Sequence, residues 1–155
     1  MDACKLPLTI VVVDDDSDDR ELIREAFVRT CKCLDLVLKQ DGLELMEYLE
    51  TRGTSAPCLI VLDLNMPRMT GIEALQRIRS DSDLLNIPVI IFTTTDEDAT
   101  VMKSYCTGAT SFIKKPVTWG ELLLVIDMVA RYWCEVVKLP CRMGCNDLDS
   151  PKTAA

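Results

Sequence analysis

The feature that most constrains the fold is a set of short apolar runs, rich in β-branched residues, of which two end in carboxylates. The run at 8–13 leads directly into three aspartates that begin at Asp14, and the run at 58–63 ends in Asp63. Unbroken apolar runs of this length are typical of parallel strands that are covered on both faces. Because the carboxyl ends of parallel strands meet at one edge of a sheet, the pattern predicts a shared acidic site there.

Helix-like segments separate five such runs. The expected strands cover residues 8–13, 34–39, 58–63, 88–93 and 110–114, and the last expected helix covers residues 118–134. Ser17 is expected to cap the first helix, with Asp16, Asp18 and Asp19 as solvated charges at its start. Strict alternation of strands and helices predicts one α/β domain with a parallel sheet and right-handed crossovers.

Composition narrows the classes of function. The 155 residues are 48% hydrophobic and 27% charged, which indicates a globular domain. A formal net charge of -8 disfavours binding to nucleic acid or to anionic membranes. No apolar stretch approaches the roughly 20 residues that span a bilayer, and the start of the chain lacks a signal-peptide pattern, so we expect a soluble cytoplasmic protein. The absence of histidine excludes Ser-His-Asp and Cys-His catalysis and histidine-bound metals.

Eight cysteines are many for a cytoplasmic protein. They are Cys4, Cys31, Cys33, Cys58, Cys106, Cys134, Cys141 and Cys145. No two form a C-x-x-C pair, and Cys31-Lys32-Cys33 is too tight for the usual zinc spacing. We interpret them as reduced thiols, several of them buried as small apolar side chains, with a redox or metal role as the alternative.

The residues at the expected strand ends suit phosphoryl chemistry. Asp14 and Asp15 can bind Mg²⁺, directly or through its waters. Asp63 can act as a nucleophile toward a phosphoryl group, provided that a metal ion neutralises the repulsion between the two anions. The hydroxyl of Thr93 can donate to a phosphate oxygen, and the ammonium of Lys115 can pair with carboxylate and phosphate.

In this combination the sequence resembles the receiver domain of two-component response regulators. The matching motifs are Asp14-Asp15, Asp63-Leu64-Asn65-Met66-Pro67 followed by Gly71, then Thr93, and Lys115-Pro116. Each motif alone is weak evidence, but all four in this order are highly specific. The resemblance implies a doubly wound (βα)5 flavodoxin-like fold with a five-stranded parallel sheet of order 2-1-3-4-5. It covers about residues 7–134, which leaves 135–155 as a C-terminal extension and tail.

The resemblance also implies a metal site around the phosphoacceptor. Asp63 would accept the phosphoryl group and contribute to binding of the metal. Asp15 would bind Mg²⁺ directly, Asp14 would bind it through water, and Asn65 would offer its backbone carbonyl.

A switch is implied at the neighbouring strands. Thr93 and Lys115 would bind the phosphoryl oxygens, and Phe112 lies at the family's switch-aromatic position, although an aromatic residue there is as often part of the core. A sensor histidine kinase would supply the phosphoryl group. The protein would not be an enzyme toward other substrates, because it accepts and slowly loses a phosphoryl group on itself.

A narrower likeness is to the stand-alone regulators that partner bacterial and cyanobacterial phytochromes. It rests on Arg131-Tyr132-Trp133, on Leu139-Pro140 and on Thr93-Thr94-Thr95. The expected helix at 118–134 is apolar on too many sides to bury them all against one sheet. We therefore expect a homodimer through the fourth helix, fifth strand and fifth helix, together with the C-terminal extension.

Two other classes of function stay open. A phosphatase of the haloacid-dehalogenase type also uses an aspartate nucleophile at a strand end, but it requires a second aspartate two residues later, where this chain has Asn65. A phosphorylation-independent adaptor would use the fold only as a scaffold, and the acidic pair together with Lys115 argues against it.

Overall fold

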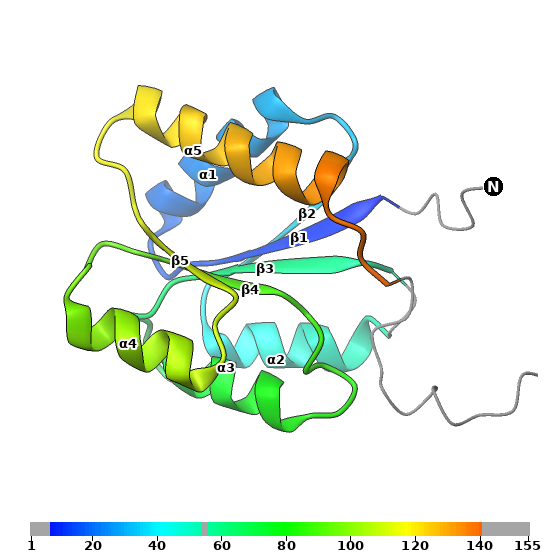
Figure 1. Ribbon diagram of the computed structural model, residues 1–155, viewed down its shortest axis with the longest axis vertical. Helices are drawn as coiled ribbons and strands as arrows, with labels where there is room; N and C mark the ends of the chain where they lie inside the picture. Colours follow the sequence, from blue (N-terminus) through cyan, green and yellow to red (C-terminus); the bar gives the residue numbers. More distant parts are fainter. Residues whose placement is uncertain (1–6, 54–55, 141–155) are drawn as a thin grey trace, which may run out of the picture.

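The computed structural model describes residues 7–53 and 56–140, which form one five-stranded sheet between two layers of helices (Figure 1). In chain order the elements are β1 (Leu8–Val13), α1 (Ser17–Thr30), β2 (Leu34–Lys39), α2 (Gly42–Thr51), β3 (Cys58–Leu62), α3 (Gly71–Ser80), β4 (Val89–Thr93), α4 (Asp98–Thr107), β5 (Ser111–Lys114), α5 (Trp119–Arg131) and the π-helix η1 (Tyr132–Val136). The strand order is β2-β1-β3-β4-β5 and every neighbouring pair is parallel. The predicted fold and strand order are therefore confirmed.

The central strands are apolar throughout because each alternate residue faces a different helical layer. In β1, Val11 and Val13 belong to the core beneath α2 and α3, whereas Ile10 and Val12 belong to the core beneath α1 and α5. Successive side chains of a strand point to opposite faces, so a strand covered on both sides needs apolar residues at every position. β2 lies at the edge of the sheet and pairs with β1 on one side only, and its residues are exposed or half-buried.

The start of α1 differs from the expectation. Asp16, rather than Ser17, is the N-cap: its carboxylate accepts hydrogen bonds from the N–H groups of Asp18 at 2.8 Å and Asp19 at 3.2 Å. Asp16 has the extended backbone that a capping residue needs, whereas Ser17 is already helical. An aspartate and a serine are equally good caps, so the sequence alone did not distinguish them.

The last helix also differs from its expected extent. α5 ends at Arg131, and the helical path continues as the π-helix η1 to Val136. Trp133 and Cys134 pack against the core that α1 and α5 share. We expected an irregular tail from Leu139 onward; beyond Pro140 it lies outside the described residues.

The described cysteines are free thiols, as expected. Cys58 lies buried in β3, and burial raises the pKa of its thiol to about 11, so it acts as a small apolar side chain. Cys4, Cys141 and Cys145 lie outside the described residues. Within 7–53 and 56–140, no helix combines the length and the hydrophobicity that a membrane crossing requires.

Candidate functional site

Backbone hydrogen bonds bring the polar residues that follow the strands to one edge of the sheet. The N–H of Asp63 donates to the carbonyl of Val13 at 2.9 Å, and the N–H of Lys115 donates to the carbonyl of Thr93 at 2.7 Å. Each bond extends the parallel ladder by one residue beyond its strand. The expectation of a shared edge is therefore met for the residues after β1, β3 and β5.

Lys115 is the centre of the side-chain cluster. Its Nζ lies 2.5 Å from Oδ2 of Asp14, 3.0 Å from Oδ2 of Asp19 and 3.4 Å from Oδ2 of Asp63. The Lys115 side chain is only 10% exposed, and those of Asp14 and Asp63 are 2% and 8% exposed. Water therefore screens these charges less than it screens charges on an open surface.

The carboxylates of this cluster suit a divalent cation. One oxygen each from Asp14, Asp15 and Asp63 lies within 4.8 Å of the other two. Asp15 is exposed while the other two are buried, so the group has an open side. Oxygen donors with excess negative charge are what Mg²⁺ and Mn²⁺ prefer. Asn65, the fourth expected ligand residue, lies exposed in the loop between β3 and α3.

The proton affinities of the two innermost groups follow from this crowding. Burial raises the pKa of Asp14 to about 6, although the hydrogen bond to Lys115 opposes the shift. Burial by itself would lower the pKa of Lys115, but its hydrogen bonds to Asp14 and Asp19 and the charge of Asp63 outweigh burial and raise that pKa. The cluster thus holds a firmly protonated lysine beside more carboxylates than it can neutralise.

Thr93 offers an unused hydrogen-bond donor at the same edge. It ends β4 and is fully buried, and its Oγ1 has no hydrogen-bond partner among the described residues. Buried hydroxyls are rarely left unpaired, so an incoming acceptor such as a phosphoryl oxygen would satisfy this one. Phe112, in the next strand, is half-buried against the core and pairs in register with Ile91. Its N–H donates to the Tyr105 hydroxyl at 3.1 Å, a contact that the sequence did not predict.

The loop from β3 to α3 is packed tightly behind Asp63. The N–H of Gly71 donates to the carbonyl of Leu64 at 3.0 Å. A Cβ atom at Gly71 would lie 2.2 Å from the carbonyl oxygen of Asp63 and 2.8 Å from the Cα of Leu64. Only glycine fits this approach, so Gly71 determines where the backbone of the phosphoacceptor candidate lies.

Sequence reasoning missed two contributors to this edge. Asp19 was expected to be a solvated charge, but its carboxylate binds Lys115. Asp41, near the end of β2, caps α2 and pairs with Arg68 of the β3–α3 loop. Arg68 has a left-handed backbone with φ 64°, which is uncommon for a residue other than glycine. No local pattern identifies these partners, because each pair joins segments that are distant in the chain.

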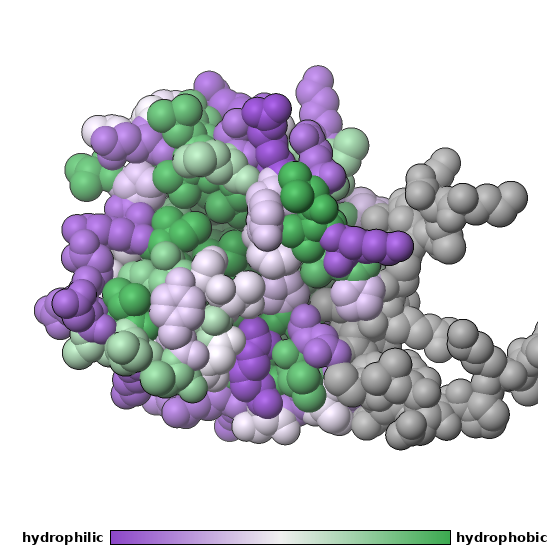
Figure 2. Space-filling model, in the orientation of Figure 1, coloured by the Kyte–Doolittle hydropathy of each residue, from purple (hydrophilic) through white to green (hydrophobic). Residues whose placement is uncertain are grey.

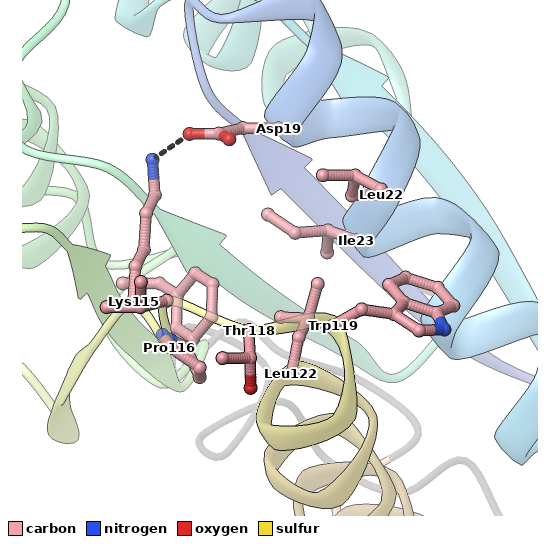
Figure 3. A pocket seen from close by; sticks show the side chains of 10 residues that line it. Asp19, Leu22, Ile23, Lys115, Pro116, Thr118, Trp119 and Leu122 are labelled. Carbon is pink, nitrogen blue, oxygen red and sulfur yellow. Dashed lines mark hydrogen bonds and ion pairs between the residues drawn. The ribbon is translucent and has the colours of Figure 1, made fainter.

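A small apolar pocket adjoins the cluster. It has a volume of about 140 Å³ and is lined by Asp19, Leu22, Ile23, Phe92, Lys115, Pro116, Val117, Thr118, Trp119 and Leu122. Figure 3 shows Leu22 and Ile23 of α1 on one side, Trp119 and Leu122 of α5 on the other, and the Asp19–Lys115 contact at the polar end. The pocket therefore connects the charged edge with an apolar surface between α1 and α5.

Comparison with known proteins points to one family. The model of the response regulator receiver domain matches residues 10–127. The response regulator Rcp1 of Synechocystis sp. is 31% identical over 138 residues, which cover 86% of this chain and 94% of that protein. The probable methanogenesis regulatory protein FilR2 of Methanothrix harundinacea is 30% identical over 130 residues, which cover 82% of this chain and 84% of that protein.

Solved structures agree with the sequence relatives. The phosphorylated cyanobacterial phytochrome response regulator RcpA superposes with a TM-score of 0.78 at 32% identity, covering 85% of this chain and 97% of that one. The Mn²⁺-bound form of Rcp1 superposes with a TM-score of 0.76 at 32% identity, covering 86% of this chain and 99% of that one.

Proposed function

The chain belongs to the response regulator receiver domain family, and on that premise we propose that it is a signalling switch that accepts a phosphoryl group on Asp63 from a sensor histidine kinase. The observation that carries the proposal is the position of Lys115, whose ammonium lies 3.4 Å from Oδ2 of Asp63 within the acidic cluster. A lysine held between a nucleophilic carboxylate and two further carboxylates is suited to bind a phosphoryl oxygen.

Asp63 performs the transfer in this proposal. A carboxylate oxygen of Asp63 bonds to phosphorus while the P–N bond of the kinase phosphohistidine breaks, and the imidazole keeps the bonding electron pair. The cation, which we propose is Mg²⁺, would supply charge neutralisation when bound. Asp15, Asp63 and the backbone carbonyl of Asn65 would hold it directly, and Asp14 would hold it through water. The donor set of the acidic cluster supports this assignment.

Three residues respond to the charge of the new phosphoryl group, namely Lys115, Thr93 and Phe112. Lys115 exchanges a carboxylate partner for a phosphoryl oxygen, and the unpaired hydroxyl of Thr93 donates to another. The resulting shift of Thr93 biases the position of Phe112 on the adjacent strand, so that phosphorylation changes the populations of two surface arrangements. The Thr93 hydroxyl, fully buried and without a hydrogen-bond partner in the described part of the chain, supports this role.

The kinase approaches across the pocket in this proposal. Leu22 is 43% exposed and Val117 is 92% exposed, so apolar side chains lie beside the polar end that contains Lys115. A partner helix that covers these side chains would bring its phosphohistidine to the charged edge. Similarity to Rcp1 and to the phytochrome response regulator RcpA favours a sensor of the phytochrome type.

A second copy of the chain is the proposed partner for the face formed by α4, β5 and α5. Apolar side chains gather over this face in Figure 2. Exposed members are Met102, Tyr105, Leu124, Met128, Tyr132 and Val136. Apolar side chains of this size on one face favour association through it, with the C-terminal extension beside it.

We propose a receiver domain at 7–134 followed by an extension at 135–155, acting in the cytoplasm. The net charge of -8 supports a protein that binds neither nucleic acid nor anionic membrane. The phosphoryl group is stored and slowly lost on the protein itself, without turnover of another substrate.

Labelling with a small phosphodonor such as acetyl phosphate tests the proposal. The parent protein should be labelled only with Mg²⁺ present, and Asp63→Asn should abolish labelling. Asp35→Asn is the matched control, since Asp35 is an exposed aspartate on the edge strand β2. Equal labelling of Asp63→Asn and the parent would refute the proposal. Sustained turnover of a phosphate monoester would favour a phosphatase, and failure to bind Mg²⁺ or beryllofluoride would favour an adaptor.

A further inference from the structure

Three cysteines converge where α1 and α5 end, far from the acidic cluster. Cys31 is the C-cap residue of α1, and its N–H donates to the carbonyl of Phe27 at 3.0 Å. Cys134 lies in η1, and its thiol lies near that of Cys31, with Cys33 close by. Figure 1 shows the chain after α1 and the end of α5 side by side.

Packing holds the first two of these thiols together. Cys31 and Cys134 are both half-buried, and both pack against the apolar core beneath α1 and α5. Cys33 is exposed and lies outside that core. α1 begins beside the acidic cluster and its 14 residues extend about 21 Å, so its end lies near the opposite edge of the sheet. The thiol pair therefore has no part in the phosphoryl chemistry proposed for Asp63.

We propose that Cys31 and Cys134 are a modification site that forms an intramolecular disulfide on mild oxidation. The pair joins two segments that already pack against the same core, so the bond requires a local movement rather than a rearrangement of the fold. That movement falls on a helix end and on a π-helical turn, and π-helical turns are frequently found at functional positions.

The oxidant is a peroxide. One thiol loses its proton and attacks the peroxide O–O bond, which gives a sulfenic acid and one water from hydrogen peroxide. The second thiol then attacks the sulfenic sulfur, loses its proton and releases a second water as the S–S bond forms. Two thiols are oxidised, and one peroxide is reduced to two waters.

The environment of Cys134 disfavours its thiolate form. Burial, followed by the neighbouring Cys31 thiol, raises the pKa of Cys134 to about 12. Cys134 is therefore protonated at neutral pH and a poor first nucleophile. Whichever thiol of the pair is oxidised first, the other is held beside it and closes the bond.

The disulfide would bind the end of α5 to α1. It would close a loop of about 100 residues, which restricts the unfolded chain strongly. It would also restrain η1, which carries the exposed Tyr132 and Val136 of the proposed self-association face. Oxidation would thus act on the opposite end of α5 from the Lys115 cluster.

Peptide mapping of the full chain tests the site, because trypsin places each relevant cysteine in a different peptide. Cleavage at Arg and Lys separates Cys31 in the peptide 30–32, Cys33 in 33–39 and Cys134 in 132–138. After limited treatment with hydrogen peroxide, and without reductant, we expect 30–32 joined to 132–138 in a monomer. Dithiothreitol should separate them, and the oxidised protein should have a higher Tm than the reduced protein.

Single variants complete the test. Cys31→Ser and Cys134→Ser should each abolish the linked peptide and the rise in Tm. Cys106→Ser is the matched control, since Cys106 is exposed on α4, and it should leave both unchanged. A link between 30–32 and 33–39, links between chains only, or oxidation that leaves Cys31 and Cys134 as free thiols would each overturn the proposal. The parent protein alone distinguishes these outcomes, whether or not a variant folds.

Discussion

Two aspartates, each near the end of one of two neighbouring strands, behave in opposite ways. Asp14 follows β1 and Asp41 follows β2, and they are 1% and 3% exposed. Burial raises the pKa of Asp14 to about 6. For Asp41 burial acts in the same direction, but hydrogen bonds from the Glu44 N–H and from Arg68 outweigh it and lower the pKa.

The difference lies in the partners rather than in the depth of burial. One oxygen of Asp41 accepts from the Glu44 N–H at 3.0 Å, and the other accepts from Nε of Arg68 at 2.8 Å. Asp14 instead shares the one ammonium of Lys115 with two other carboxylates. A buried carboxylate with its own cation and cap stabilises the fold, whereas one that shares its cation is left for a ligand to complete.

The largest expected effect comes from moving the loop that both clusters share, since it begins at Asp63 and carries Arg68. Gly71→Ala should destabilise the protein by about 3 kcal/mol, because the new Cβ would overlap the Asp63 carbonyl. Urea unfolding measures this. Gly120→Ala is the control: a Cβ there meets no atom within 4 Å, so stability should change by less than about 1 kcal/mol. Equal effects of the two substitutions would show that the loop is not tightly packed.

The next largest effect is expected from Mg²⁺, which should stabilise the protein through the Lys115 cluster and not through the Asp41–Arg68 pair. At a Mg²⁺ concentration ten times the Kd, the parent should gain roughly 1.4 kcal/mol of stability. Asp15→Asn should lose most of this gain, because it removes one carboxylate of the cluster, and Asp41→Asn should retain it. Thermal unfolding with Mg²⁺ and with a chelator gives both values. A gain that disappears in Asp41→Asn but persists in Asp15→Asn would reverse the assignment of the two clusters.

Charge removal at each aspartate should then affect stability differently. In the presence of a chelator, Asp41→Asn should cost about 1 kcal/mol, because Arg68 loses its anion and the cap of α2 weakens. Asp14→Asn should leave stability unchanged or slightly raised, because it removes a buried charge beside Asp63 while Lys115 keeps two carboxylates. Equal losses in urea unfolding would contradict the contrast.

The smallest expected effect is a dependence on acid. The pKa of Asp41 is lower in the folded protein than its ordinary value of 3.8, so the folded state binds this proton less readily than the unfolded state. The contribution of Asp41 to the free energy of unfolding is therefore complete above pH 3.8 and is lost as pH falls through the pKa of the folded state. The parent should lose more stability than Asp41→Asn over this acidic range, and Asp35→Asn should follow the parent. Parallel curves for the parent and Asp41→Asn would show that the pair contributes nothing to acid stability.

Much of the fold was predictable because it depends on local patterns. The unbroken apolar run of β1 indicates that both faces of the strand are covered. Asp14 and Asp63 mark the residues at which β1 and β3 have ended. The prediction of Ser17 as the N-cap of α1 was wrong. Asp16 and Ser17 have similar capping preferences, and only the backbone conformation distinguishes them. The prediction that Asp19 is a solvated charge was wrong for a related reason. Whether its carboxylate is solvated or bound depends on how α1 is oriented toward Lys115.

Local patterns along the chain specify the alternating α/β architecture, the parallel sheet and the chemical types gathered at its carboxyl edge, since these follow from burial and from strand periodicity. Three-dimensional packing specifies which carboxylates share Lys115, which one pairs with Arg68, and which thiols lie near each other. The physical reason is that charge balance depends on distance and on loss of water, and both are set by residues far apart in the chain.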